Sequence, residues 1–220
     1  MPSATVHLLR HGEVFNPEGV LYGRLPNFHL SDRGVAMAVL AAEYFQSLAG
    51  RGAVFAVLRA SPLTRAQETA QPTASALGLA IGTDQRLIEA GNDFEGLKMS
   101  PAELLKPIHW PKLVNPFRPS WGESYRAQVD RMRLAVDDAR RAAVERAGDG
   151  AQAILVSHQL PIWVSRLSAE RRRLFHDPRR RDCSLASVTS LEFDGERLSG
   201  VGYHEPAAAL LPGATATAGA

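Results

Sequence analysis

The stretch Thr5-Val6-His7-Leu8-Leu9-Arg10-His11-Gly12-Glu13 is the one around which the chain is organised. Its apolar run is short, begins with β-branched residues and stops at Gly12, a pattern typical of a strand buried in an α/β sheet. Such sheets bind ligands at the carboxyl ends of their strands, where Arg10 and His11 stand. A guanidinium matches the geometry of phosphate, and an imidazole with a pKa of about 6.5 is a usable nucleophile or base. An Arg-His-Gly tripeptide alone is also consistent with an ordinary strand end, because short motifs occur by accident.

Composition narrows the class of protein. The chain has 220 residues, 45% of them hydrophobic, which is enough for a full core in one domain. A net charge of +2 is too small for a nucleic-acid platform, and no basic blocks alternate with aromatic residues. The single cysteine, Cys183, excludes an internal disulfide and fits a reducing compartment. With no targeting segment or membrane-length apolar run in view, we expect a soluble cytoplasmic protein that binds neither membranes nor nucleic acids.

The pattern of apolar and turn residues predicts alternating strands and helices. Helical spacing begins after Ser31 and again after Ser124, both good N-caps, and a third helix is expected over residues 63–77. Buried strands are expected over residues 53–60 and 153–156. Asp194-Gly195 joins two alternating segments as a hairpin. The predicted fold class is therefore α/β, with a mostly parallel central sheet that has an antiparallel end.

Two segments fall outside this regular pattern. Residues 92–121 contain five prolines, which predicts an insert over the active-site edge of the sheet. Their local excess of Lys and Arg suits an anionic substrate, although a solvated loop would show it too. Residues 206–220 are mostly Ala, Gly, Thr and Pro, and we expect disorder there. We therefore expect a single domain over residues 1–205, followed by a disordered tail.

Three strand ends of the predicted sheet carry polar residues suited to an anion. Arg10 and His11 follow the first strand, Arg65 follows Ser61-Pro62 after the second, and His158 follows the strand at 153–156. Strand ends on one edge converge, and imidazoles and guanidiniums held together repel unless an anion neutralises them. A phosphoryl group, with a charge of about −1.5 to −2 at neutral pH, is such an anion. The clusters Arg171–Arg173 and Arg179–Arg181 are more typical of a solvated face, with a site for a substrate phosphate as the alternative.

Transfer of a phosphoryl group also needs a proton for the leaving oxygen. Glu89 follows an apolar pair, as a carboxyl at a strand end would, and partial burial would raise its pKa towards the working range of an acid. A surface carboxylate is the alternative on sequence alone. The long loop over residues 13–30 holds Asn16, Tyr22 and Gly23, and loops of about 18 residues are uncommon unless functional.

Three motifs together resemble those of the histidine phosphatase superfamily, in its phosphoglycerate-mutase-like branch. They are Leu9-Arg10-His11-Gly12-Glu13, Ser61-Pro62-Leu63-Thr64-Arg65-Ala66 with Thr69-Ala70, and Val156-Ser157-His158. The resemblance implies a three-layer α/β/α fold without a metal or nucleotide cofactor. It implies a phosphohistidine on His11 and a proton donor at Glu89. The residues that it implies for binding the phosphoryl group are Arg10, Asn16, Arg65 and His158, and we add Tyr22 and Gly23 of the first loop as substrate-binding candidates.

Two departures from the family pattern affect single residues. Asn16 follows His11 with one residue fewer between them than is common, and the acid region Glu89-Ala90-Gly91-Asn92-Asp93-Phe94-Glu95-Gly96 is one residue short. Asp93 and Glu95 therefore remain alternatives to Glu89 as the proton donor.

Three functions stay open on sequence alone. A phosphatase acting on a small phosphorylated metabolite is favoured, because a mutase must exclude water from the phosphohistidine and the tail looks unable to close a site. A phosphoglycerate-type mutase is the alternative. A non-catalytic module that binds a phosphorylated ligand would need neither a nucleophile nor an acid. The sequence gives no oligomeric state.

Overall fold

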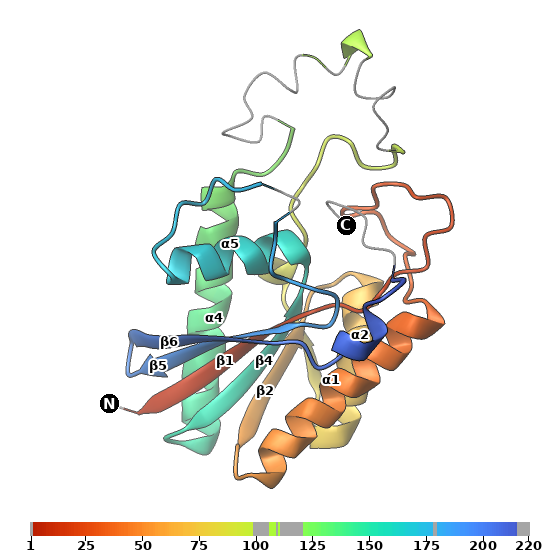
Figure 1. Cartoon of the computed structure of the whole chain (residues 1–220). Helices are drawn as coiled ribbons and strands as arrows, with labels where there is room; N and C mark the ends of the chain where they lie inside the picture. Colours follow the sequence, from red (N-terminus) through yellow and green to blue (C-terminus); the bar gives the residue numbers. More distant parts are fainter. Residues whose placement is uncertain (1, 99–105, 109, 111–120, 178–179, 215–220) are drawn as a thin grey trace.

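A six-stranded mixed sheet forms the centre of the molecule (Figure 1). The computed structural model describes residues 2–98, 106–108, 110, 121–177 and 180–214. The strand order is β3-β2-β4-β1-β5-β6, in which β3, β2, β4 and β1 run parallel and β5 and β6 run antiparallel to their neighbours. The strands are β1 (Ser3–Arg10), β2 (Phe55–Ala60), β3 (Ile81–Thr83), β4 (Ala151–Ser157), β5 (Val188–Asp194) and β6 (Arg197–His204). The mostly parallel sheet with an antiparallel end is thus confirmed.

Helices cover both faces of this sheet. The helices are α1 (Asp32–Gly50), α2 (Thr64–Leu77), α4 (Tyr125–Ala147) and α5 (Gln159–Ala169), with short 3-10 turns η1 (Gln85–Leu87) and η3 (Ala208–Leu210). The helices α1 and α2 pack together on one face, and α4 packs with α5 on the other (Figure 1). The expected three-layer α/β/α arrangement is therefore present.

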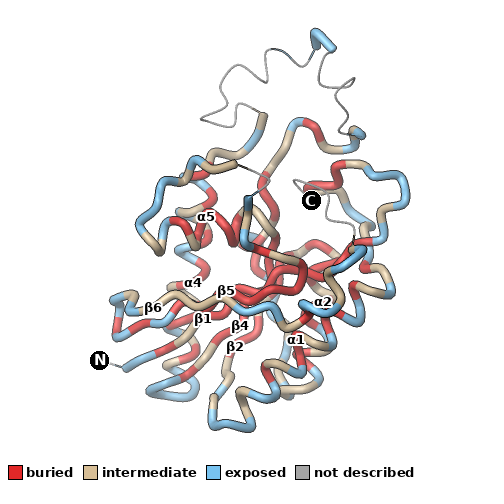
Figure 2. The backbone as a smooth tube through the Cα atoms, in the orientation of Figure 1, coloured by how far each residue is buried: buried red, intermediate tan, exposed pale blue. Residues whose placement is uncertain are grey.

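The buried core lies on both faces of β1. Val6 and Leu8 join the cluster beneath α4 and α5, whereas Leu9 joins the cluster beneath α1 and α2. His7, on the same side of the strand as Leu9, is also buried and bonds to Ser190 and Gln152, so both faces of β1 are covered. The buried part of the backbone accordingly runs through the middle of the molecule (Figure 2).

Helix ends lie where the capping residues predict them. The Ser31 side chain accepts a hydrogen bond from the Gly34 amide at the start of α1, and that of Ser124 accepts one from the Ala127 amide at the start of α4. Gly78 ends α2 in the left-handed region, with φ of 65°. The predicted starts of α1 and α4 and both predicted bounds of α2 are confirmed to within about two residues.

Strand register brings the chemically important ends together. Arg10 at the end of β1 lies beside Ser157 at the end of β4, and Val156 of β4 lies beside Ala60 at the end of β2. The residues that follow these three strands therefore share one edge of the sheet. In Figure 1 the loop over residues 13–30 and the segment leading into the insert stand above this same edge.

The insert and the first loop are joined by backbone pairing. Val20 forms a bridge with Lys98, and Asn92 forms one with Gly122, where the chain leaves and re-enters the insert. Most of the predicted insert, 99–105, 109 and 111–120, lies outside the described residues. Its described part exposes the side chains of Ile108 and Trp110.

The expectation of disorder from residue 206 is wrong for residues 206–214. Ala207 is buried beside Met37 of α1 and Ala186, and Leu210 and Leu211 pack against the same cluster. Apolar side chains around one short 3-10 turn pack into this cluster, which a composition rich in Ala and Gly does not reveal. Residues 215–220 lie outside the described part of the chain.

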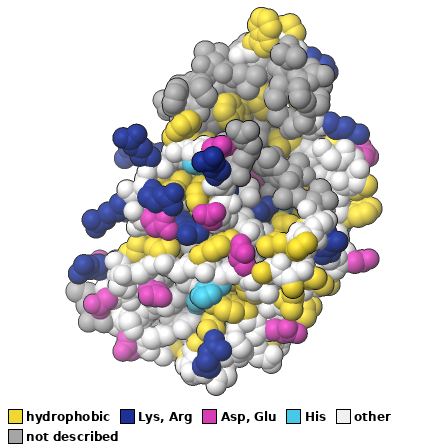
Figure 3. Space-filling model, in the orientation of Figure 1, with side chains coloured by type: hydrophobic (Ala, Val, Ile, Leu, Met, Phe, Trp, Pro, Cys, Tyr) yellow, Lys and Arg dark blue, Asp and Glu magenta, His cyan; other side chains and the backbone are white. Residues whose placement is uncertain are grey.

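The surface shows mixed charge. Figure 3 displays positive and negative side chains dispersed over the face seen in Figure 1, with hydrophobic side chains among them. In the part of the chain that the structure describes, no helix is long and apolar enough to cross a bilayer.

Candidate active site

Two histidines face each other at the carboxyl edge of the sheet. His11 follows β1 and His158 follows β4, and both side chains are fully buried. Their ring centroids are 5.1 Å apart. The structure thus brings together the two imidazoles that the sequence placed on separate strand ends.

The His11 ring is held in one orientation and one tautomer. Its Nδ1 lies 2.8 Å from the carbonyl oxygen of Gly12, which can only accept a hydrogen bond. Nδ1 must therefore carry the proton, and Nε2 keeps a lone pair. Nε2 is buried and has no hydrogen-bond partner among the described residues, so this lone pair is available to an electrophile.

The His158 ring takes the opposite arrangement. Its Nε2 lies 2.7 Å from the Ser61 hydroxyl at the end of β2, while its buried Nδ1 has no protein partner among the described residues. A neutral ring whose Nε2 accepts the Ser61 proton carries its own proton on Nδ1. His158 would then offer a donor where His11 offers a lone pair.

Both rings are held neutral by their surroundings. Burial is the main cause that lowers the pKa of His11, and the positive charges of Arg65 and Arg10 lower it further. Burial likewise lowers the pKa of His158, and Arg65 adds to this effect. Neutral imidazoles are needed for both the lone pair and the single donor described above.

Two buried guanidiniums stand beside the histidines. The Arg65 NH2 donates to the Gly23 carbonyl at 2.6 Å, and its Cζ lies 4.7 Å above the ring of Tyr22. Its buried Nε has no partner among the described residues. Arg10 donates through NH1 to the Cys183 carbonyl at 2.7 Å. Arg65 makes no ion pair with a described carboxylate, so the charge of this guanidinium is suited to an incoming anion.

Glu89 supplies a buried carboxyl to the same site. Its side chain is 2% exposed, with Oε1 accepting from the Ala90 amide at 2.7 Å and Oε2 left without a partner among the described residues. Burial raises the pKa of Glu89, and the charges of Arg65, Arg181 and Arg10 oppose that rise. A buried carboxyl with a raised pKa keeps its proton to higher pH than an exposed one, as a general acid requires.

Comparison with known proteins shows the family of the chain. The family model described as "Histidine phosphatase superfamily (branch 1)" matches residues 6–205. The chain belongs to the histidine phosphatase superfamily. It is 53% identical over 211 residues to the uncharacterized protein Rv0525 of Mycobacterium tuberculosis, covering 94% of this chain and 100% of that one.

Solved structures of the superfamily share the fold. A mycobacterial glucosyl-3-phosphoglycerate phosphatase, Rv2419c, is 26% identical with a TM-score of 0.69, covering 86% of this chain and 90% of that chain. Phosphoglycerate mutase from Bacillus anthracis is 21% identical with a TM-score of 0.64, covering 88% of this chain and 89% of that chain. The fold therefore accommodates phosphatases and mutases alike.

The first loop of this superfamily member lies over the site in part. Tyr22 is buried with its ring centroid 6.5 Å from that of His11, and Gly23 contributes its carbonyl to Arg65. Asn16 instead bonds to its own loop: its Nδ2 donates to the Val20 carbonyl, and its Oδ1 accepts from the Val20 amide. Of these three residues, Asn16 is the one that the structure does not join to the site by a hydrogen bond or ring contact.

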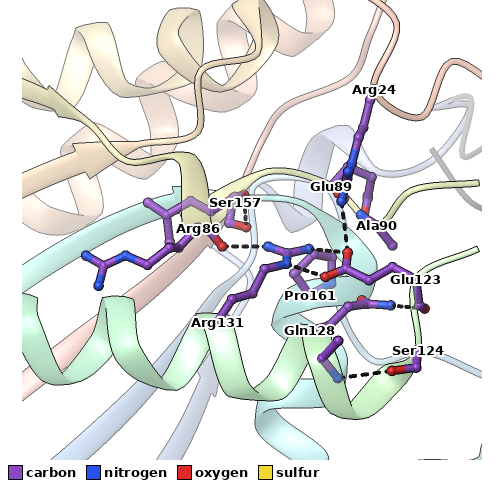
Figure 4. A network of polar contacts seen from close by, with 12 residues as sticks. Arg24, Arg86, Glu89, Ala90, Glu123, Ser124, Gln128, Arg131, Ser157 and Pro161 are labelled. Carbon is purple, nitrogen blue, oxygen red and sulfur yellow. Dashed lines mark hydrogen bonds and ion pairs between the residues drawn. The ribbon is translucent and has the colours of Figure 1, made fainter.

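A charged network fixes the backbone of Glu89 (Figure 4). Arg24 donates through Nε to the Glu89 carbonyl at 2.7 Å and through NH2 to Glu123 at 2.9 Å. Arg131 of α4 holds both carboxylate oxygens of Glu123 and also donates to the Arg86 carbonyl. The first loop, the Glu89 segment and α4 are thus joined at one point. The sequence analysis assigned no role to Glu123 and Arg131, because no local sequence pattern indicates residues whose hydrogen bonds join three separate segments.

The alternative acids take other positions. Asp93 is exposed, and Glu95 accepts a hydrogen bond from the Arg24 amide at 2.9 Å. Glu89 is the buried one of the three. In the described ranges, no group of three or more His, Cys, Asp and Glu side chains is arranged to hold a metal ion.

The two basic clusters differ in their surroundings. Arg171, Arg172, Arg173 and Arg180 are exposed, and Arg179 lies outside the described residues. Arg181 is partly buried and acts electrostatically on Glu89. The expectation of a solvated face therefore holds for the first cluster and fails for Arg181.

Proposed function

We propose that this chain is a phosphomonoesterase that hydrolyses small phosphorylated metabolites through a phosphohistidine on His11. The observation that carries the proposal is the His11 ring, whose Nδ1 bonds to the Gly12 carbonyl and whose Nε2 lone pair is buried beside Arg65 and His158. Phosphoryl transfer asks mainly for positioning and for stabilisation of charge on the equatorial oxygens.

The proposed first step forms the phosphoenzyme. The Nε2 lone pair of His11 attacks phosphorus, and the bond between phosphorus and the ester oxygen breaks. Glu89 gives its proton to the departing oxygen, which leaves as an alcohol. Arg10, Arg65 and the Nδ1 proton of His158 donate to the oxygens of the transferred group.

The proposed second step hydrolyses the phosphohistidine. The Glu89 carboxylate takes a proton from water as the water oxygen attacks phosphorus. The bond between phosphorus and Nε2 breaks, which restores neutral His11 and protonated Glu89 and releases phosphate. The buried, free Cys183 supports a reducing compartment such as the cytoplasm as the place of this reaction.

A mutase is the second candidate. The sequence argued against a mutase because a disordered tail could not help to close the site. Residues 206–214 are packed, which weakens that argument. The 26% sequence identity to the glucosyl-3-phosphoglycerate phosphatase Rv2419c supports hydrolysis. We therefore place phosphatase first.

One experiment separates the candidates. Monophosphoglycerate is supplied with and without a trace of bisphosphoglycerate, and released phosphate and isomer exchange are followed together. Hydrolysis predicts phosphate release without faster exchange. Exchange that outruns release by orders of magnitude would identify a mutase, and a lack of turnover and of phosphoenzyme, with a generic aryl phosphate as well, would identify a binding module.

A further inference from the structure

Arg181 lies in the connection between α5 and β5 and is held entirely by neutral groups. Its Nε donates to Nε2 of His176 at 2.9 Å, and its NH1 donates to the Gln159 side-chain oxygen at 3.2 Å. Nδ1 of His176 lies 2.7 Å from the Leu174 carbonyl, so that nitrogen carries the ring proton and Nε2 accepts from Arg181. The guanidinium is therefore fixed in place without a carboxylate.

These contacts attach Arg181 to the catalytic edge. Gln159 directly follows His158 at the start of α5, and its amide nitrogen lies 3.4 Å from the Cys183 carbonyl. The same carbonyl accepts from NH1 of Arg10 at 2.7 Å. The charges of Glu89 and Arg10 both act on Arg181. Arg181 thus borders the site between Glu89 and the start of α5.

Arg181 forms no close ion pair with a carboxylate of the described residues. No described carboxylate lies within 4.0 Å of its guanidinium. Glu89, whose pKa is raised by burial, is proposed to be protonated before the first step. A phosphoryl dianion held by Arg10 and Arg65 carries at most about two negative charges, which leaves the third positive charge unbalanced in a partly buried place.

The free donors of Arg181 are also suited to an anion. Its two bonds use Nε and NH1, so NH2 makes no hydrogen bond with any described residue. A guanidinium held at one edge presents its remaining N–H groups in a fixed direction. This arrangement is typical of a prepared binding group and differs from that of the exposed Arg180 beside it.

We propose that Arg181 binds a second anionic group, carboxylate or phosphate, on the leaving-group side of the substrate. The inference rests on the proposed function, because it places the transferred phosphoryl group between Arg10 and Arg65. It narrows the substrate class to phosphate monoesters whose alcohol carries a further negative charge near the ester. Arg181 is on this view a specificity-determining residue.

Binding of non-hydrolysable phosphonates tests this without turnover. Phosphonoacetate and 3-phosphonopropionate are compared by calorimetry with ethylphosphonate and propylphosphonate, which match them in length but lack the carboxylate. Methylenebisphosphonate provides the arm for a second phosphate-like group. We expect wild-type protein to bind at least one doubly acidic probe about tenfold more tightly than its alkyl counterpart, which corresponds to ~1.4 kcal/mol.

Variants assign that preference to Arg181. The ratio of the dissociation constant of the alkyl probe to that of the doubly acidic probe should fall to about one in Arg181→Gln and become intermediate in Arg181→Lys. It should remain about ten in Arg180→Gln, the matched control. A wild-type ratio near one for every probe would overturn the inference, and so would an unchanged ratio in Arg181→Gln. If Arg181→Gln does not fold, the wild-type ratio and the ratio in Arg181→Lys still test the inference, because it predicts about ten for the first and a lower value for the second. Turnover of 4-nitrophenyl phosphate and its loss in His11→Ala report separately on the proposed function.

Discussion

The Ser61 hydroxyl lies 2.7 Å from Nε2 of His158, so a hydrogen bond joins the end of β2 to the imidazole at the end of β4. Ser61 and His158 are both fully buried, and water cannot readily replace the hydroxyl. With Nε2 accepting from Ser61, the proton sits on Nδ1, which has no other partner among the described residues. In this tautomer His158 is a neutral donor buried beside His11.

Ser61→Ala should lower kcat/KM for an aryl phosphate by about tenfold, because one buried hydrogen bond contributes about 1 kcal/mol and its loss frees the ring to change tautomer. Ser61→Thr keeps a hydroxyl and should retain most of the activity. Steady-state kinetics on the three proteins check this. Full activity in Ser61→Ala would show that Ser61 does not orient His158.

Arg65→Lys should lower kcat/KM by about tenfold to a hundredfold. A lysine ammonium cannot bond the Gly23 carbonyl, stack on Tyr22 and bind two phosphoryl oxygens at once, and charge-assisted hydrogen bonds contribute about 1.5–3 kcal/mol each. Arg59→Lys is the matched control, because Arg59 lies on β2 and pairs with Asp84. Near-normal rates in Arg65→Lys would place Arg65 outside the reaction.

Glu89→Gln should slow phosphoenzyme formation far more for alkyl than for aryl phosphates, because an aryl oxide leaves without help from a proton. In the wild-type protein, turnover of alkyl phosphates should fall as pH rises through the raised pKa of Glu89, since the acid then loses its proton. Single-turnover rates with both esters measure this. Glu95→Gln is the control, and a larger, leaving-group-dependent loss in that variant would move the acid role to Glu95.

His7 should make the fold sensitive to acid. Burial lowers its pKa to about 4, and its ring bonds to Ser190 and Gln152. Below pH 6.5 the unfolded chain binds the His7 proton and the native chain does not, so stability falls as pH drops from about 6.5 to 4.

Between pH 7.5 and 5.0 the His7 contribution is a loss of about 2 kcal/mol from the free energy of unfolding. In His7→Asn this share of the loss should be absent, as urea unfolding at the two pH values would show. Equal losses in both proteins would mean that the unfavourable charging of His7 does not drive the acid sensitivity.

The sequence predicted the α/β class, the antiparallel end of the sheet and the polar residues at the strand ends, but it predicted neither the short strand β3 nor the strand order. Val6 and Leu8 on one face and Leu9 on the other are typical of a strand that is covered on both sides, and parallel strands bring their carboxyl ends to one edge of the sheet. The tautomers of His11 and His158 could not be predicted from the sequence, because they depend on hydrogen bonds with the Gly12 carbonyl and the Ser61 hydroxyl.

The remaining misses share one physical cause, which is contact between segments far apart in the chain. Ala207 is buried in a cluster with Met37 of α1 and Ala186, although its local composition favours disorder. Arg181 looked like part of a solvated basic cluster until its bonds to Gln159 and His176 were visible. Such pairings have no periodic signal in a single sequence.

The most direct test of the account is to locate the phosphoryl group on the enzyme. Protein mixed with 4-nitrophenyl phosphate is quenched in base, digested, and mapped by mass spectrometry, with phosphorus NMR assigning the ring nitrogen. The account predicts a phosphoryl group on Nε2 of His11 and none in His11→Ala. A phosphoryl group on Nδ1 of His11 or on any other residue would contradict it.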